Sequence, residues 1–207
     1  MKIALDFDDV LVDFVGAWLN SANTELGLEV SREDIRLEGW DMAKHASKLV
    51  GMDWLEWIRL HLDYWMAAET TPRAVEAIAI LADDGHEVQI VTSKPGWARP
   101  IVWNWLAKNN PKVYKVVITN HFSKHDASDA DVLVDDRPST VRAWVDSSPD
   151  RYGILFARSQ NVSDRKGLMV AETFDDVVHI VDTLSKIRRT DNGRARTLYP
   201  AGHTLGK

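Results

Sequence analysis

The chain has 207 residues, a formal net charge of −6 and no cysteine, so it has no disulfide framework, no thiolate zinc site and no cysteine nucleophile. The negative charge argues against a broad nucleic-acid-binding surface, and nothing in the chain resembles a signal peptide or a membrane span. With 45% hydrophobic and 27% charged residues, we expect one globular domain with a small insertion, located in the cytoplasm.

The amino-terminal segment predicts a short buried strand at residues 2–6 that ends in an acidic run. Because side chains alternate between the two faces of a strand, Asp6 and Asp8 should point in the same direction. Several acidic residues at the end of a buried strand favour a divalent-cation site and proton transfer. A solvated acidic turn is the structural alternative.

A helix is predicted next at residues 12–27, with an apolar stripe and Gly27 at its end. Residues 31–66 contain no convincing strand and predict a small helical insertion, which begins with a capping-box pattern at Ser31 and Asp34. Tryptophans cluster in this stretch, where they serve either packing or a wall for a flat ligand such as a nucleobase. These are Trp40, Trp54, Trp57 and Trp65.

The remaining sequence alternates between helical and strand patterns. Helices are predicted at 72–84, 97–109, 138–146 and 173–188, and strands at 87–92, 114–119, 131–134 and 152–156. This alternation predicts an α/β fold with a parallel sheet flanked by helices on both faces. Ligands of such folds bind at the carboxyl ends of the strands. After these elements, residues 190–207 predict a poorly packed, flexible tail.

Polar groups follow four of the predicted strands. They are Asp6 and Asp8, then Thr92 and Ser93, then Lys124 in a loop, and finally Asp135 and Asp136. A carboxylate can attack phosphorus, a second acid can protonate the leaving oxygen, and hydroxyls with a lysine can hold phosphate oxygens. Each feature alone has a structural explanation as a helix cap, a turn or a surface residue. Together at one edge of the sheet they favour phosphoryl transfer with Mg²⁺.

Taken in chain order, these features resemble the four motifs of the haloacid dehalogenase (HAD) superfamily of phosphotransferases. Within the superfamily, three stretches are most similar to the 5′(3′)-deoxyribonucleotidases: Asp6–Phe14, Val91–Ser93 and Leu133–Pro138. The resemblance extends over about residues 1–188. It implies a Mg²⁺-dependent phosphatase that dephosphorylates (deoxy)nucleoside monophosphates through an aspartyl phosphate.

The same resemblance implies the domain organisation. A Rossmann-like HAD core is expected from residues 1–30 and 67–189. A small helical cap, residues 31–66, is expected as an insertion after the first strand and helix.

Roles for individual residues also follow from the resemblance. Asp6 would be the nucleophile and a Mg²⁺ ligand, and Asp8 the general acid/base, with its backbone carbonyl as a second ligand. Asp136 would be the direct acidic ligand. Asp135 would act through water or orient the lysine, although these two aspartates could exchange roles.

The phosphate would be held by Thr92, Ser93 and Lys124. Phe14 and Trp40 are candidates for contacts to the base, with core or cap packing as the alternative, and Lys94 is a further candidate substrate contact.

The chain departs from the family pattern at three positions, which leaves its base and sugar preference open. Asp9 stands where many relatives have glycine, Lys94 where the animal nucleotidases have proline, and Phe122 where an arginine is expected.

Two other functions remain open from the sequence. One is a HAD phosphatase for a sugar phosphate or another small phosphomonoester, and the other is a phosphorylatable receiver-like regulatory domain. Under the phosphatase hypotheses the partner is a small phosphorylated molecule, with no stable nucleic-acid partner and no membrane. The oligomeric state is open, a homodimer included.

Overall fold

A parallel sheet forms the centre of the computed structural model, which describes all residues except 33, 35–41, 120–122 and 191–207. Within the described residues the sheet has six strands, all paired in parallel, in the order β3-β2-β1-β4-β5-β6. The strands are β1 (Lys2–Leu5), β2 (Glu87–Ser93), β3 (Lys115–Thr119), β4 (Val132–Asp135), β5 (Tyr152–Phe156) and β6 (Met169–Ala171). The predicted α/β class with a parallel sheet flanked by helices is therefore confirmed.

The strand order reverses beside β1, and this reversal positions the site. From β1 the chain moves outward on one side through β2 and β3, and then crosses back to place β4 on the other side of β1. Leu5 pairs in register with Val134, so the residues that follow β1 and the end of β4 emerge next to each other. A crevice at such a switch point is where open α/β sheets bind their ligands.

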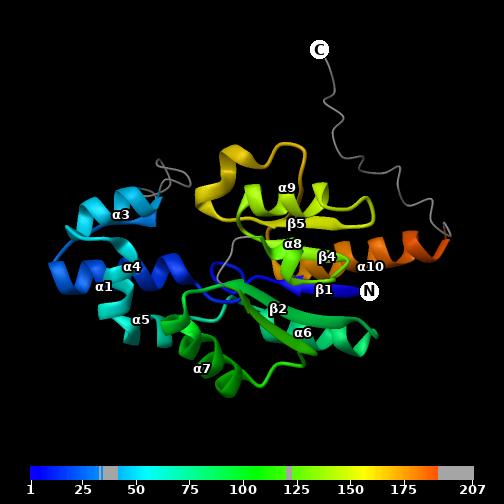
Figure 1. Cartoon of the computed structure of the whole chain (residues 1–207), viewed down its shortest axis with the longest axis horizontal. Coiled ribbons are helices and arrows are strands. Elements are labelled where there is room, and N and C mark those ends of the chain that lie inside the picture. Colours follow the sequence, from blue (N-terminus) through cyan, green and yellow to red (C-terminus); the bar gives the residue numbers. More distant parts are fainter. Residues whose placement is uncertain (33, 35–41, 120–122, 191–207) are drawn as a thin grey trace, which may run out of the picture.

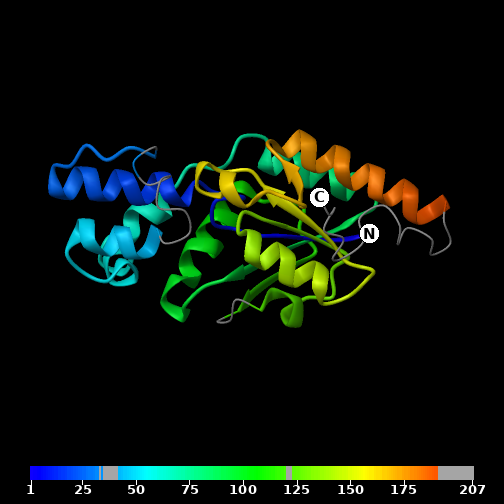
Figure 2. The ribbon, with the colours of Figure 1, turned by 90° about the horizontal axis from the view of Figure 1, so that it is seen from above.

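Helices cover both faces of the sheet. On one face lie α6 (Ala74–Asp83) and α10 (Phe174–Thr190), which pack against each other, and on the other lie α8 (Lys124–Ala127) and α9 (Pro138–Asp146). Figure 2 shows these two layers with the sheet between them. The strands are apolar on both sides because both faces are covered, as the fully buried residues of β4 illustrate.

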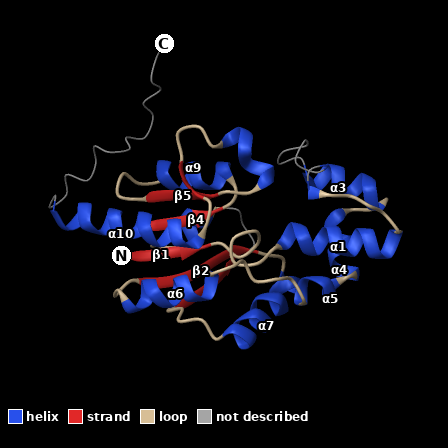
Figure 3. Ribbon diagram, turned by 180° about the vertical axis from the view of Figure 1, so that it is seen from behind, coloured by secondary structure: helices blue, strands red, loops and turns tan. Residues whose placement is uncertain are grey.

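A second group of helices lies beyond the carboxyl ends of the strands (Figures 1 and 3). It consists of α1 (Phe14–Leu26), α3 (Met42–Val50), α4 (Trp54–Leu60) and α5 (Leu62–Met66), with α1 packed against α3 and α5. α7 (Arg99–Asn109) packs against α5 and connects this group to the core. The described part of the insertion is helical, as expected, while the division into core, cap and tail stays a prediction.

Local capping explains where α1 begins and ends. The Asp13 side chain accepts a hydrogen bond from the Gly16 backbone N–H (3.0 Å), and Gly27 ends the helix at a φ of 63°. The predicted capping box is also present, because the Ser31 N–H and hydroxyl donate to Asp34 (2.8 and 2.6 Å) while the Asp34 N–H donates to the Ser31 hydroxyl (3.3 Å).

Four short elements differ from the sequence expectation. The helix expected from residue 97 begins at Arg99, after a 3₁₀ turn at Gly96–Ala98, and another 3₁₀ helix forms at Ser159–Asp164. β6 is a three-residue strand at the sheet edge, too short to show a period in the sequence. Lys124 was expected in a loop, but it is the first residue of α8 and is buried. None of the described helices combines the length and the apolar character needed to span a membrane.

One close contact in the core gives a stability prediction. A Cβ at Gly153 in β5 would lie 2.6 Å from Val141 Cγ1 and 3.1 Å from the Val141 carbonyl oxygen of α9. Gly153→Ala should therefore lower the free energy of unfolding by about 1–3 kcal/mol, measured by denaturant titration. Gly96→Ala is the control, because its Cβ would meet no atom within 4 Å. Equal stability of the two variants would show that α9 moves away from β5 without cost.

Candidate active site

Three buried carboxylates meet where β1 and β4 end. Asp6 follows β1, Asp135 ends β4 and Asp136 comes next, and they are 8%, 1% and 4% exposed. One oxygen from each lies within 4.8 Å of the others. A hydrogen bond from the Asp6 N–H to the Val134 carbonyl (2.9 Å) fixes the two chain segments side by side. The sequence placed these acids at one edge of the sheet, and the structure brings them together.

The ammonium group of Lys124 lies between two of these acids. Its Nζ is 2.7 Å from Asp6 Oδ1 and 2.7 Å from Asp135 Oδ2. Burial by itself would lower the pKa of Lys124, but the two carboxylates outweigh burial and raise the pKa above its ordinary value. Lys124 therefore stays charged, holding Asp6 in place together with the Phe7 N–H, which donates to Asp6 Oδ1 at 2.7 Å.

Asp135 and Asp136 have different surroundings. Asp135 is bound on both oxygens, by Lys124 and by the Arg137 N–H at 2.8 Å, and burial raises its pKa to about 6. Burial also raises the pKa of Asp136 well above its ordinary range, with the negative charges of Asp9, Asp135 and Asp6 adding to the effect. Asp136 thus faces uncompensated negative charge, which a cation would relieve.

Asp8 forms an ion pair with Lys94. The Lys94 Nζ lies 2.7 and 2.6 Å from the two Asp8 oxygens and 5.0 Å from the centre of the Phe7 ring. Burial raises the pKa of Asp8, and the charge of Lys94 opposes this. Lys94 follows β2, and its N–H donates to the Thr119 carbonyl (2.9 Å), so two adjacent strands position the amino group.

Asp9 adopts a backbone conformation that favours glycine. Its φ of 53° lies in the left-handed region, which gives a physical reason for the glycine of many relatives. The Asp9 carboxylate compensates for this unfavourable backbone conformation, because it accepts a hydrogen bond from the Val15 N–H (3.0 Å) in the first turn of α1. Burial raises the pKa of Asp9 to about 7.

The segment after β5 supplies residues that sequence reasoning missed. Arg158 donates to the Asp9 carbonyl and to the Thr71 hydroxyl (2.9 Å). Asn161 is fully buried, and its Nδ2 donates to the Asp136 carbonyl at 2.8 Å. Gln160 lies beside two of the acids and is 3% exposed. Their position past the carboxyl end of a strand was the available signal, but no local motif marks them.

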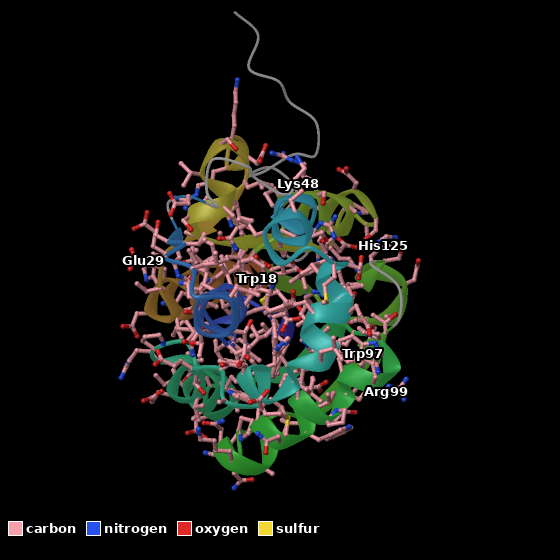
Figure 4. The ribbon with its side chains drawn as sticks, turned by 90° about the vertical axis from the view of Figure 1, so that its left-hand side faces the viewer. Trp18, Glu29, Lys48, Trp97, Arg99 and His125 are labelled. Carbon is pink, nitrogen blue, oxygen red and sulfur yellow. The ribbon has the colours of Figure 1, made fainter. Side chains whose placement is uncertain are left out.

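A cavity of about 750 Å³ opens onto the acids. Thr92 and Ser93 line its polar floor together with Lys94, Lys124 and the five aspartates, so the predicted phosphate-binding residues share one space. The apolar part of the lining, called the wall below, includes Phe14, Trp54, Leu55, Ile58, Trp65, Trp97 and Ile101. Figure 4 shows the end of the molecule that carries the helices of this wall, with Trp97 labelled.

Aromatic contacts organise the apolar wall. The Phe14 ring meets Trp54 edge-on, with ring centroids 5.8 Å apart, and Trp65 at a tilt, with centroids 5.5 Å apart. Phe14, a predicted substrate contact, therefore lines the cavity. The other predicted base contact, Trp40, lies outside the described residues. The sequence offered no means of choosing Trp54 and Trp65 over Trp40.

Comparison with known protein families finds a match over most of the chain. The family described as "5′ nucleotidase, deoxy (Pyrimidine), cytosolic type C protein" matches residues 1–187. No curated protein sequence matches the chain.

Similar solved structures share the fold at low identity. YfnB from Bacillus subtilis, described as a HAD-hydrolase bound to magnesium, has a TM-score of 0.63 at 10% identity, covering 87% of this chain and 98% of its own. A HAD hydrolase of family IA from Entamoeba histolytica has a TM-score of 0.58 at 13% identity, covering 84% and 94%. CbbY from Rhodobacter sphaeroides, in complex with xylulose-(1,5)bisphosphate, has a TM-score of 0.57 at 12% identity, covering 84% and 94%.

The raised pKa values predict how the stability of the metal-free protein depends on pH. The pKa of Asp9, about 7, and that of Asp135, about 6, exceed the unfolded value near 4, so the folded state binds protons more tightly than the unfolded state. The free energy of unfolding in chelator should therefore fall as the pH rises from 5 to 8, by about 1–3 kcal/mol. Denaturant titrations at several pH values measure it.

Asp9→Asn is the matched variant for this experiment. Asparagine tolerates the left-handed backbone and retains an oxygen that can accept from the Val15 N–H, but it does not titrate. The free energy of unfolding of Asp9→Asn should therefore vary less with pH than that of the unmodified protein. A stability that rises with pH in both proteins would contradict the assignment of raised pKa values to these acids.

Proposed function

The chain belongs to the cytosolic type C 5′-deoxynucleotidase family, a group of HAD-like phosphomonoester hydrolases, and from this premise we propose that it dephosphorylates (deoxy)nucleoside monophosphates in the cytoplasm. The observation that carries the proposal is one cavity that joins an acidic, lysine-bearing floor to a wall of aromatic rings. The floor suits a phosphate with a cation, and the wall suits a planar base.

A Mg²⁺ ion fits the residues at the floor. Asp6 and Asp136 would hold it with the Asp8 backbone carbonyl, an all-oxygen donor set of the kind that Mg²⁺ prefers. Five of the residues that line the cavity are aspartates, and three are cations, Lys94, Lys124 and Arg137, so the lining carries a formal charge of −2. When bound, the ion would neutralise charge on the phosphoryl oxygens.

The residues of the floor suit a two-step transfer. A carboxylate oxygen of Asp6 attacks phosphorus, and the bond between phosphorus and the ester oxygen breaks as the aspartyl phosphate forms. Asp8 gives its proton to the leaving oxygen of the nucleoside. In the second step Asp8 takes a proton from water, whose oxygen attacks phosphorus and releases phosphate and the restored Asp6 carboxylate.

Other residues hold the reacting groups during both steps. Lys124 already contacts Asp6 at 2.7 Å, so its charge lies where the phosphoryl group would be transferred. Thr92 and Ser93 supply hydroxyls at the end of β2 for the remaining phosphate oxygens. Asp135, bound on both oxygens, fits the role of orienting Lys124, which leaves Asp136 for the cation.

The apolar wall favours a nucleotide over a sugar phosphate. A sugar presents hydroxyls that need polar partners, and the wall offers mainly hydrocarbon and aromatic surface. A receiver-like switch would have no need for a cavity of about 750 Å³ beside the phosphorylated residue. The sugar-phosphate alternative is therefore the outcome to be tested against the nucleotide.

The first test concerns the nucleophile. Asp6→Asn keeps the size of the side chain but removes the attacking charge, so turnover of nucleoside monophosphates should fall by a factor of about 10³ or more. Phosphate release with Mg²⁺ measures it. Asp83→Asn, an exposed acid at the end of α6, is the control and should keep full activity. Persistence of most of the activity in Asp6→Asn would refute the covalent mechanism.

The second test separates a nucleotide from a small generic substrate. Trp54→Ala removes a ring of the cavity wall and its edge contact with Phe14. Because stacking on a base is worth about 1–3 kcal/mol, KM for deoxynucleoside monophosphates should rise about tenfold or more. KM for p-nitrophenyl phosphate, which has no nucleobase, should change little.

Trp103→Ala is the matched control, because Trp103 is 54% exposed on α7 and is not among the residues that line the cavity. Equal losses on both substrates in Trp54→Ala would mean that the ring only supports the cavity wall. Efficient hydrolysis of sugar phosphates with no nucleotide turnover would instead favour the alternative substrate class.

A further inference from the structure

Gln160 lies between two carboxylates that come from different parts of the chain. Its Nε2 is 3.5 Å from Asp9 Oδ2 and 3.4 Å from Asp136 Oδ2. Asp9 belongs to the turn after β1, and Asp136 follows β4. Because the Gln160 side chain is only 3% exposed, bulk water cannot replace these contacts.

The amide is suited to this position by its chemistry. Its nitrogen carries two hydrogens, so it can donate one to each carboxylate, whereas the reversed orientation would direct Oε1 at two negative groups. Oε1 instead accepts from the Ser159 hydroxyl at 3.4 Å. The Gln160 amide thus bridges the two carboxylates. Because this bridge is neutral, it reduces the repulsion between Asp9 and Asp136 without cancelling the negative charge that attracts a cation. A lysine at this place would compete with that cation.

Asn161 fixes the backbone beside this bridge. Its Nδ2 donates to the carbonyls of Asp136 (2.8 Å) and Phe156 (2.9 Å), and its Oδ1 accepts from the Arg158 N–H (3.1 Å). The end of β4 and the segment after β5 are thereby joined immediately next to Gln160. The buried hydrogen bonds of Asn161 to these two segments consequently set the position of the neighbouring Gln160 relative to Asp136.

We propose that Gln160 is a positioning residue for the cation site, which holds the Asp136 carboxylate in place against Asp9 and so sets the affinity for Mg²⁺. The inference rests on the proposed function in one respect, the assignment of Asp136 as a Mg²⁺ ligand. Outer partners that orient a metal ligand typically contribute 10–100-fold to affinity or activity. The long distances at Gln160 suggest the lower end of this range, about tenfold.

The experiment compares two glutamine variants of the full chain. Gln160→Met keeps the length of the side chain but removes both donors, and the dissociation constant for Mg²⁺ measured by calorimetry should rise about tenfold. The increase in melting temperature at a fixed Mg²⁺ concentration should shrink accordingly. Gln89→Met is the matched control, a buried glutamine of β2 whose Oε1 has no hydrogen-bond partner among the described residues. Its Mg²⁺ affinity should equal that of the unmodified protein.

Activity provides a second readout that a purely structural role would not give. Excess Mg²⁺ should restore turnover by Gln160→Met, and KM for the phosphorylated substrate should be normal at saturating Mg²⁺. Should Gln160→Met fail to fold, Gln160→Asn, which retains the amide but withdraws it by one methylene, serves for the same titration. Unchanged Mg²⁺ affinity in whichever variant folds overturns the inference, as does a deficit equal to that of Gln89→Met.

The failure of this inference is distinguishable from that of the proposed function. Calorimetry of Mg²⁺ needs no substrate, so a Gln160 effect on affinity supports the inference even if the protein hydrolyses no nucleoside monophosphate. Conversely, normal nucleotide turnover with equal Mg²⁺ affinity in all variants overturns the role of Gln160 and leaves the nucleotidase proposal standing.

Discussion

The contact of the Lys124 ammonium with Asp6 and Asp135 is the interaction on which the rest of the site depends. Burying a carboxylate without a partner is strongly unfavourable, and removing one partner of a buried ion pair typically costs about 3–5 kcal/mol. Lys124 is placed at the beginning of α8, where it reaches the ends of β1 and β4 at once. The position of α8 beside the sheet is therefore tied to the charge of two acids that come from other strands.

Lys124 neutralises only part of the negative charge of the five aspartates. The remaining charge explains how Asp8, Asp9 and Asp136 are surrounded. Asp8 has its own partner in Lys94, whereas Asp9 and Asp136 are approached mainly by neutral amide and backbone donors. Such donors satisfy oxygen atoms but leave the charge in place, which keeps the site attractive to a divalent cation. The fold thus tolerates raised pKa values at buried acids, and under the proposed function these acids form the place where a phosphate and its counterion would bind.

Floor and wall of the cavity come from different parts of the chain and have separate functions. The floor is assembled from the ends of parallel strands and carries groups suited to phosphoryl transfer, which is the chemistry common to HAD-like phosphatases. The wall is contributed by α1, α4, α5 and the beginning of α7, and the Phe14 ring contacts the rings of both Trp54 and Trp65. Under the proposed function, substrate choice would depend on this wall, since fold alone does not define a substrate.

Much of this arrangement follows from local sequence patterns. The bounds of α9 and β5 agree with their sequence prediction because Pro138 opens a helix and Tyr152–Phe156 is a compact apolar run. The acids after β1 and β4, with Thr92 and Lys124, were identifiable because they follow apolar strands whose parallel pairing could be inferred. β6 could not be predicted, since three residues at a sheet edge carry no period and pair only because β5 is already in place.

What the sequence determined by itself is the strand-and-helix alternation and the acids, hydroxyls and lysine at the strand ends, because these depend on residue type and spacing along the chain. Only the tertiary structure decided that Lys94 pairs with Asp8, that Trp54 and Trp65 line the cavity, and that Gln160 lies between Asp9 and Asp136. Gln160 and Asp9 are about 150 residues apart in the chain, separated by four strands, and their contact exists because the sheet reverses its strand order beside β1. No local pattern encodes such a contact, since it depends on how whole elements pack together.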